Sequence, residues 1–285
     1  MKPYEIQNFR DGYIDLVDYV IAKGKPVAPR GYKTWEVEDA CFTLLDPADC
    51  LPVGVGRKLN PAIMAAEAVL LIGGISSPSL LVSVSDQFRR FLDGGDLHGG
   101  YGRRIRWQLR DAVRTLSSDP SSRQAVVQIW DPAYDSGAQV NDLPCTLGFN
   151  FRLRNDQLHM SATMRSSDVW LGAAYDVGMF CQLGWSVANA LDVPLASYTH
   201  HAYSLHLYER NLEATQQLNA VADEPSVDLR GLGDFSESIA EIQEVARDIY
   251  NGVEPRGGGA SKTEQWFIDT LKPYDRLTAK ENFAS

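Results

Sequence analysis

The sequence has 285 residues, of which 44% are hydrophobic and 22% are charged, and its formal net charge is −10. This composition excludes extended disorder, because it supplies enough aliphatic and aromatic residues for a hydrophobic core. The acidic balance excludes a broad basic surface, so we expect no nucleic-acid polymer as a partner. A small anionic ligand stays compatible with it, since a few placed arginines are enough to bind one.

No segment predicts a membrane span, because the longest strongly apolar stretch, residues 62–75, contains Glu67 and is too short for a bilayer. The amino terminus lacks the apolar core of a signal peptide, so we expect a cytoplasmic protein with no membrane partner. The four cysteines form no C-x-x-C pair and no paired Cys/His spacing, so we expect reduced thiols and no metal. These cysteines are Cys41, Cys50, Cys145 and Cys181.

Helices and strands are expected to alternate irregularly along the chain. Pro61 before an Ala- and Leu-rich run predicts a helix that ends at Gly73 and Gly74, and the β-branched run at residues 125–130 predicts a strand. The other expected elements are a short helix at 86–92, a glycine-rich loop at 94–102, a helix at 104–116, two strands at 147–153 and 158–164, a mostly buried helix at 177–191, a strand at 205–211, a helix at 236–251, and a polar tail at about 255–285 with a flexible glycine stretch at 257–259. Without a repeat, a linker or a regular β-α-β order, the sequence predicts one mixed α/β domain over residues 1–285.

Two segments carry isolated reactive side chains. Asp142-Leu-Pro-Cys145 places a cysteine just before an expected strand, where it is either an exposed nucleophile or a buried small hydrophobe. His206-Leu-Tyr208 places two polar side chains on one face of an expected strand. A lone histidine or tyrosine at such a position is usually structural, so neither segment alone identifies a site.

A third segment carries groups that suit a nucleotide. Arg165 and Ser166 together make a good phosphate clamp. Asp168 and Asp176 follow closely, and each can hydrogen-bond a heterocycle. The alternative is a solvated loop with a salt bridge.

Taken together, the order and spacing of these segments resemble the thymidylate synthase family, whose pattern is P-C, then Q-R-S-x-D, L-G-x-P-F-N and D-x-H-x-Y. The matching segments are PC at 144–145, MRSSD at 164–168, LGAAYD at 171–176 and SLHLY at 204–208. Upstream, LHGGYG at 97–102 resembles L-G-P-V-Y-G, DPSSRQ at 119–124 resembles D-P-x-S-R-R, and Glu67 lies in a helix similar to E-L-x-W-F-L-x-G. With a weaker match at Arg30, the resemblance covers about residues 30–211.

The resemblance implies a reaction as well as a fold. The implied fold is a single α+β domain in which helices pack on a mixed sheet and two sheets meet in a homodimer. Cys145 is implied to attack C6 of a pyrimidine nucleotide monophosphate, after which C5 takes a one-carbon unit from 5,10-methylenetetrahydrofolate. Arg165 is expected to favour the thiolate, Glu67 to order the water that moves protons, and Tyr101 to belong to the catalytic group.

The resemblance also implies which residues bind. The 5′-phosphate is implied to contact Arg30, Arg165, Ser166 and, from the neighbouring subunit, Arg123. Gln124 replaces a second arginine of the family pattern, so the phosphate site has one charge fewer. The remaining implied contacts are His206 and Tyr208 with the sugar 3′-hydroxyl, and Asp168, Phe88 and Gly172 with the folate.

One departure from the family pattern concerns the base. Asp176 stands where the pattern has the asparagine that pairs with uracil. Cytosine presents an acceptor at N3 and a donor at its amino group, which a carboxylic acid matches, and protonation at N3 also assists attack at C6. The same change marks the cytidylate (dCMP or CMP) 5-hydroxymethylase branch of the family, so we expect Asp176 to read cytosine and to take part in catalysis.

Other departures concern the product. Phe88 and Phe91 have the spacing of a family tryptophan pair that lies near the folate, and the chain ends in ENFAS instead of an apolar terminus. A less sealed site admits water, so we expect a hydroxymethyl product. The alternatives are a cytidylate C5-methyltransferase, a thymidylate synthase acting on dUMP, and a non-catalytic nucleotide-binding relative. Ribose and deoxyribose are both compatible with the sequence; dCMP would indicate phage DNA modification and CMP would indicate nucleoside antibiotic synthesis.

Overall fold

A mixed sheet of eight strands forms one layer of the computed structural model, which describes residues 4–218, 226–233, 237–253 and 260–274. The strands run in the order β1-β3-β8-β6-β5-β4, with β2 paired to β3 and β7 paired to β8. β3 is antiparallel to β8 whereas β6 is parallel to it, which confirms the expected mixed sheet. The strands are β1 (Tyr4–Ile6), β2 (Lys25–Val27), β3 (Thr34–Leu44), β4 (Val126–Gln128), β5 (Thr146–Arg154), β6 (Gln157–Met164), β7 (Ser167–Asp168) and β8 (Leu195–Tyr208).

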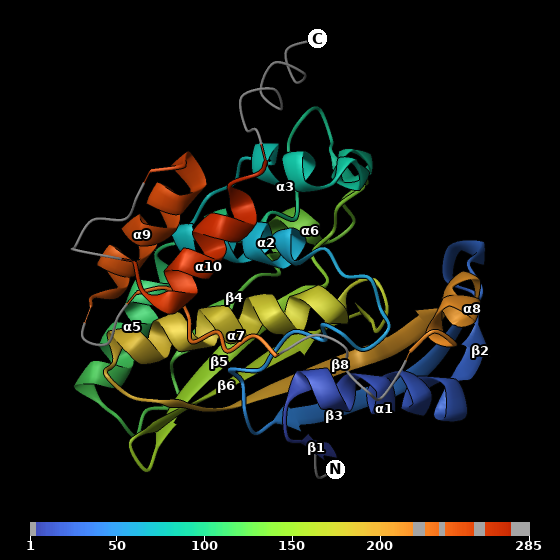
Figure 1. The fold of residues 1–285 in the computed structure, drawn as a ribbon, viewed down its shortest axis with the longest axis horizontal. Coiled ribbons are helices and arrows are strands. Elements are labelled where there is room, and N and C mark those ends of the chain that lie inside the picture. The colour runs from blue at the N-terminus through green and yellow to red at the C-terminus, as the bar shows by residue number, and fades with distance from the viewer. Residues whose placement is uncertain (1–3, 219–225, 234–236, 254–259, 275–285) are drawn as a thin grey trace.

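Helices cover this sheet, and α7 lies directly on it with α2, α9 and α10 beyond (Figure 1). The helices are α1 (Phe9–Lys23), α2 (Pro61–Gly73), α3 (Ser79–Val84), α4 (Tyr101–Ile105), α5 (Gln108–Ser118), α6 (Pro132–Asp135), α7 (Ala173–Ala190), α8 (Leu212–Thr215), α9 (Ile239–Asn251) and α10 (Lys262–Leu271), with short 3-10 turns η1 (Pro29–Gly31), η2 (Asp86–Phe91) and η3 (Glu209–Asn211).

The helix α2 forms as the sequence predicts. The side chain of Asn60 accepts a hydrogen bond from the Ala62 N–H, which satisfies one free donor of the first turn. Pro61 suits the first turn because it has no N–H to leave unpaired. Gly74 ends the helix with φ 66°, a left-handed conformation that glycine adopts without steric cost.

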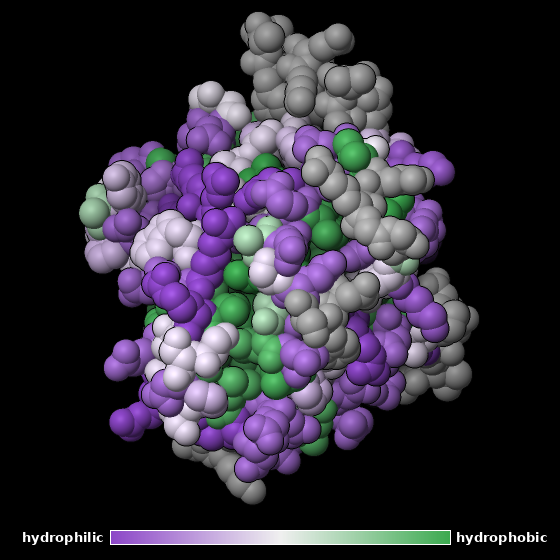
Figure 2. Space-filling model, turned by 90° about the vertical axis from the view of Figure 1, so that its left-hand side faces the viewer, coloured by the Kyte–Doolittle hydropathy of each residue, from purple (hydrophilic) through white to green (hydrophobic). Residues whose placement is uncertain are grey.

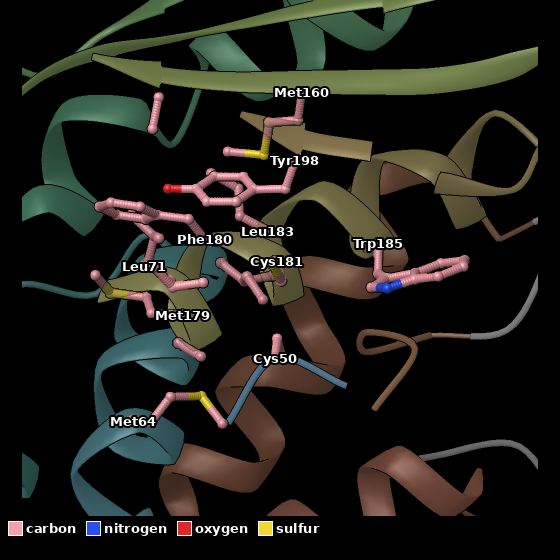
Figure 3. Packing of buried hydrophobic residues seen from close by; sticks show 14 of the residues in the cluster. Cys50, Met64, Leu71, Met160, Met179, Phe180, Cys181, Leu183, Trp185 and Tyr198 are labelled. Carbon is pink, nitrogen blue, oxygen red and sulfur yellow. The ribbon is translucent and has the colours of Figure 1, made fainter. Parts of the chain in front are cut away.

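The core lies between the sheet and α2, and α7 fills it. Figure 3 shows Phe180 and Leu183 of α7 between Met160 and Tyr198 of the sheet and Leu71 of α2. All five side chains are buried. Tight packing on both sides fixes α7, and with it the first turn of the helix, relative to the strands.

Two expected elements have different bounds in the structure. The expected strand at 205–211 is the end of β8, which begins ten residues earlier at Leu195 and gives way to η3 at Glu209. β8 pairs with β3 on one side and with β6 on the other, so tertiary hydrogen bonds extend it beyond its local signal. The expected helix at 104–116 is divided between α4 and α5, with a break at Arg106 and Trp107.

The expected polar tail at 255–285 is wrong in part, because it contains α10. Phe267 and Leu271 of that helix are fully buried in the core. Ser261 and Glu264 form a reciprocal capping box, which defines where the helix begins. The glycine stretch at 257–259, the terminus at 281–285 and Ser236, where the helix now seen as α9 was expected to start, lie outside the described residues.

The surface in Figure 2 is mostly hydrophilic around a central hydrophobic area. In the described chain, large hydrophobic side chains such as Trp107, Val126 and Tyr134 are exposed. Contiguous exposed hydrophobic areas are typical of protein–protein contacts. The sheet-to-sheet homodimer stays a prediction. Of the helices described, none has the length and apolar character needed to cross a membrane.

Candidate active site

Cys145 lies immediately before β5, as the sequence predicts, and is half-buried. The Arg165 N–H donates to the Cys145 carbonyl at 2.8 Å, and the Arg165 guanidinium donates to the Pro144 carbonyl at 2.8 Å. These bonds hold the guanidinium beside the thiol. Burial raises the pKa of Cys145, and the charge of Arg165 opposes that rise by favouring the thiolate.

Carboxyl groups from three separate segments lie near one another, and the charges of two of them, Asp176 and Asp142, act on the thiol. Asp176 lies in the first turn of α7, Glu67 in the middle of α2, and Asp142 in the loop before β5. Burial, with a contribution from the nearby Asp168, raises the pKa of Asp176 to about 7. Burial, reinforced by the charges of Asp176 and Asp142, raises the pKa of Glu67 to about 8. At neutral pH such groups exchange protons readily, as acid–base catalysis requires.

Tyr101 is the first residue of α4 and joins the same cluster. Its hydroxyl accepts a hydrogen bond from the Thr146 N–H at 3.3 Å, next to Cys145 in the chain. Burial raises the pKa of Tyr101 well above its ordinary value, and the charges of Cys145 and Asp176 add to the rise. The hydroxyl therefore keeps its proton and is available as a hydrogen-bond donor.

The predicted phosphate arginines are only partly brought together. Arg30 lies in η1 with φ 51°, is exposed, and is close enough to lower the pKa of Cys145. Ser166 follows Arg165 between β6 and β7. Arg123 is exposed in the loop before β4, and no described residue forms an ion pair with it. Its contribution to the neighbouring subunit's site stays a prediction.

The predicted sugar and folate residues meet where β7 pairs with β8. Asp168 lies opposite His206 in register, and the His206 and Tyr208 rings are 5.3 Å apart. One Asp168 oxygen accepts from the Trp170 and Leu171 N–H groups at 2.8 and 3.0 Å. The other oxygen, Oδ2, is buried and has no hydrogen-bond partner in the described part of the chain. An unsatisfied buried acceptor of this kind suits a ligand N–H.

The two other predicted folate residues lie in separate places, Gly172 beside Asp168 and Asp176, and Phe88 beside Phe91. A Cβ at Gly172 would lie 3.1 Å from the Asp176 carboxylate and 3.3 Å from the Asp168 carbonyl, so glycine permits this close approach. Phe88 lies in η2, partly buried, with its ring 6.3 Å from that of Phe91. The folate contacts of both residues stay predictions.

A second polar group, for which the sequence motifs predict no role, lies beside the site. Asp135 is fully buried and accepts two hydrogen bonds from Arg104, at 2.6 and 3.0 Å, and pairs with the His98 imidazole at 2.8 Å. Burial opposes ionisation of Asp135, but the hydrogen bonds from Arg104, from the Asp131 N–H and from His98 outweigh it and hold its pKa at about 2. The only sequence signal for this group was the glycine-rich loop that contains His98.

Comparison with known proteins places this arrangement in a family. Residues 11–247 match the model for thymidylate synthase, so the chain belongs to the thymidylate synthase family. The match is wider than the expected 30–211. Members of the family are one-carbon transferases that bind a pyrimidine nucleotide monophosphate and use methylenetetrahydrofolate.

The names of individual relatives give different activities. A deoxyuridylate hydroxymethyltransferase of Bacillus phage SP01 is 30% identical over 69% of this chain, and the match covers 56% of the phage protein. Putative thymidylate synthases of Methanothermobacter thermautotrophicus and Methanothermobacter marburgensis are 30% and 28% identical over 75% of this chain, and the matches cover 96% and 97% of those proteins. None of these three is named for a cytidylate.

Proposed function

We propose that the protein is a folate-dependent 5-hydroxymethyltransferase acting on a cytidine nucleotide monophosphate, CMP or dCMP. The observation that carries the proposal is the position of Asp176, a half-buried residue whose carboxyl lies close to Cys145, where the family pattern has asparagine. With a pKa near 7, the carboxylic acid can donate to N3 of cytosine and accept from the amino group. Alternatively, the carboxylate pairs with cytosine protonated at N3 through two charge-assisted hydrogen bonds.

Uracil fits the same group less well. Only the acid form of Asp176 offers uracil both a donor for O4 and an acceptor for the N3–H, because a carboxylate would face O4 with like charge. A buried polar group left unpaired costs about 1–3 kcal/mol. Cytosine, unlike uracil, can take the proton at N3, so only cytosine can form the pair with two charge-assisted hydrogen bonds to Asp176.

The other residues have roles in this proposal. The Cys145 thiolate adds to C6, the arginines Arg30 and Arg165 with Ser166 hold the phosphate together with Arg123 of the partner subunit, and Glu67 and Tyr101 act on the proton at C5 through water. His206 and Tyr208 receive the sugar hydroxyl. The unpartnered Oδ2 of Asp168 fits a pterin N–H, and the bound folate supplies a one-carbon unit at the oxidation level of formaldehyde.

A second candidate is hydroxymethyl transfer to dUMP, which the phage relative's name favours. One assay separates the candidates: the enzyme is incubated with CMP, dCMP or dUMP and methylenetetrahydrofolate, and tritium release from C5 and product mass are measured. A hydroxymethylated cytidylate is the expected product. A methylated product with dihydrofolate would reject water capture, preferred turnover of dUMP would support the second candidate, and binding without tritium release would identify a nucleotide-binding relative.

The substitution Asp176→Asn tests how the base is read. An amide accepts from the uracil N3–H and donates to O4, so kcat/KM is expected to shift toward dUMP relative to the cytidylate by about 10²-fold, the equivalent of two mispaired hydrogen bonds. Asp192→Asn, at an exposed residue just after the same helix, is the matched control and should leave the preference unchanged. An unaltered preference in Asp176→Asn would mean that another group selects the base.

A further inference from the structure

Asp142 is a carboxyl group of the site to which neither the family pattern nor the proposed roles assign a function. It lies three residues before Cys145, and its Oδ2 accepts a hydrogen bond from the Gly99 N–H at 3.0 Å. A Cβ at Gly99 would lie 2.8 Å from that oxygen, so the glycine lets the loop close on the carboxylate. No described residue donates to the other oxygen, Oδ1, so Asp142 is anchored through one oxygen and free through the other.

Asp142 lies close both to the catalytic thiol and to a partly exposed histidine. Its charge raises the pKa of Cys145 and of Glu67, so Asp142 lies close to both groups. His98 precedes Gly99, and the His98 charge lowers the pKa of Asp142. The His98 side chain is 21% exposed and is held by the ionised Asp135. The His98 imidazole is therefore oriented by Asp135 and partly exposed close to Asp142.

We propose that Asp142 is the general base that activates the water captured by the substrate, with His98 and Asp135 as its positioning residues. This inference rests on the proposed function, because only a hydroxymethyltransferase needs such a water. A carboxyl whose pKa is raised by burial is a stronger base once ionised, which suits it to this step.

After the folate has departed, the nucleotide is bonded to Cys145 at C6 and carries an exocyclic methylene at C5. Water adds to the methylene carbon while Asp142 takes one water proton, and the electron pair of the C=C bond moves through C5 to the oxygen or nitrogen at C4. That pair then returns to form the C5–C6 double bond and expels the Cys145 thiolate. The product carries CH₂OH at C5.

The reverse of this step can be measured without folate. Wild-type enzyme is incubated in ¹⁸O-labelled water with the 5-hydroxymethyl derivative of the nucleotide it turns over, and the mass of the nucleotide is followed. Loss and return of water should exchange the hydroxymethyl oxygen. In Asp142→Asn, whose amide oxygen can still accept from Gly99, we expect exchange about 10²-fold slower or worse, while nucleotide affinity and the thermal midpoint stay close to wild type.

A matched control and a second variant make the test decisive. Asp96→Asn removes an exposed carboxylate from the loop that contains His98 and Gly99, and this variant should exchange at the wild-type rate. If Asp142→Asn does not fold, His98→Gln is used, and we expect slower exchange with a shifted pH profile. Exchange at the wild-type rate in these variants would overturn the role of Asp142 and leave the proposed function intact. Absence of exchange in wild type with every 5-hydroxymethyl pyrimidine nucleotide would instead overturn the proposed function.

Discussion

The helices α2 and α7 contribute side chains both to the apolar core and to the acidic site. Comparing these two regions explains why the carboxyl groups of the two helices have raised pKa values. Glu67 lies between Met64 and Leu71 on one face of α2, and Asp176 lies one turn before Phe180 on α7. Met64, Leu71 and Phe180 are buried hydrophobic residues (Figure 3). The two carboxyls therefore continue the core-facing stripes of their helices, where water is scarce. Their raised pKa values follow from that position.

We therefore expect substitutions in the site to lower catalytic activity and substitutions in the core to lower the stability of the fold. In the site, a change of one atom alters reactivity while the packing stays. In the core, a loss of volume alters stability, because the surroundings relax only partly.

Cys145→Ser should lower kcat by at least about 10³-fold, since an alcohol is a far weaker nucleophile than a thiolate. The thermal midpoint should stay near that of wild type, because the side chains have similar volume. Activity is measured as tritium release from C5. Cys41→Ser, on the half-buried cysteine of β3, is the control and should remain active. Full activity in Cys145→Ser would rule out a covalent bond from this residue.

Phe180→Ala should show the reverse pattern. The side chain is fully buried, so we expect a loss of about 3–5 kcal/mol in the free energy of unfolding. Urea unfolding at equilibrium measures the change. Tyr134→Ala, at a residue that is 71% exposed, should change the free energy by no more than about 0.5 kcal/mol. If Phe180→Ala changed the free energy of unfolding by as little as Tyr134→Ala, the surrounding core would have to rearrange and fill the space left by the ring.

Glu67→Gln should change how stability depends on pH. The folded protein holds a proton on Glu67 up to about pH 8, whereas the unfolded chain releases it near pH 4.5. Stability from this group is therefore fully present below about pH 4.5 and is lost as the pH rises toward 8. Each unit of pKa shift corresponds to about 1.4 kcal/mol. The glutamine variant should gain thermal stability relative to wild type at pH 8.5 but not at pH 4.5.

For comparison, Glu244→Gln changes a glutamate that is 65% exposed, on the outer side of α9. The gap between its thermal midpoint and that of wild type should be nearly the same at both pH values. If Glu67→Gln behaves in the same way, Glu67 is ionised in the folded protein at neutral pH and the apolar position of its side chain does not control its charge.

Local sequence signals predicted the helix α2, the hairpin of β5 and β6, and the position of Cys145 before β5. Each of these depends on short-range features, namely the cap and proline of α2, the turn at 154–157 and the alternation of the strands. No element was predicted for residues 1–60, which form α1 and β1 to β3. The strand β3 gains its order from pairing with β8, so its own sequence carries little of the signal.

The ordered motifs of the sequence determined by themselves the family, the identity of the candidate nucleophile and the unusual acid at position 176, because these are properties of residue type and spacing. Only the tertiary structure decided that α10 belongs to the core and that Asp142, Glu67 and Asp176 share one site. Proximity between distant segments, and the removal of water that shifts their pKa values, arise only when the helices pack on the sheet.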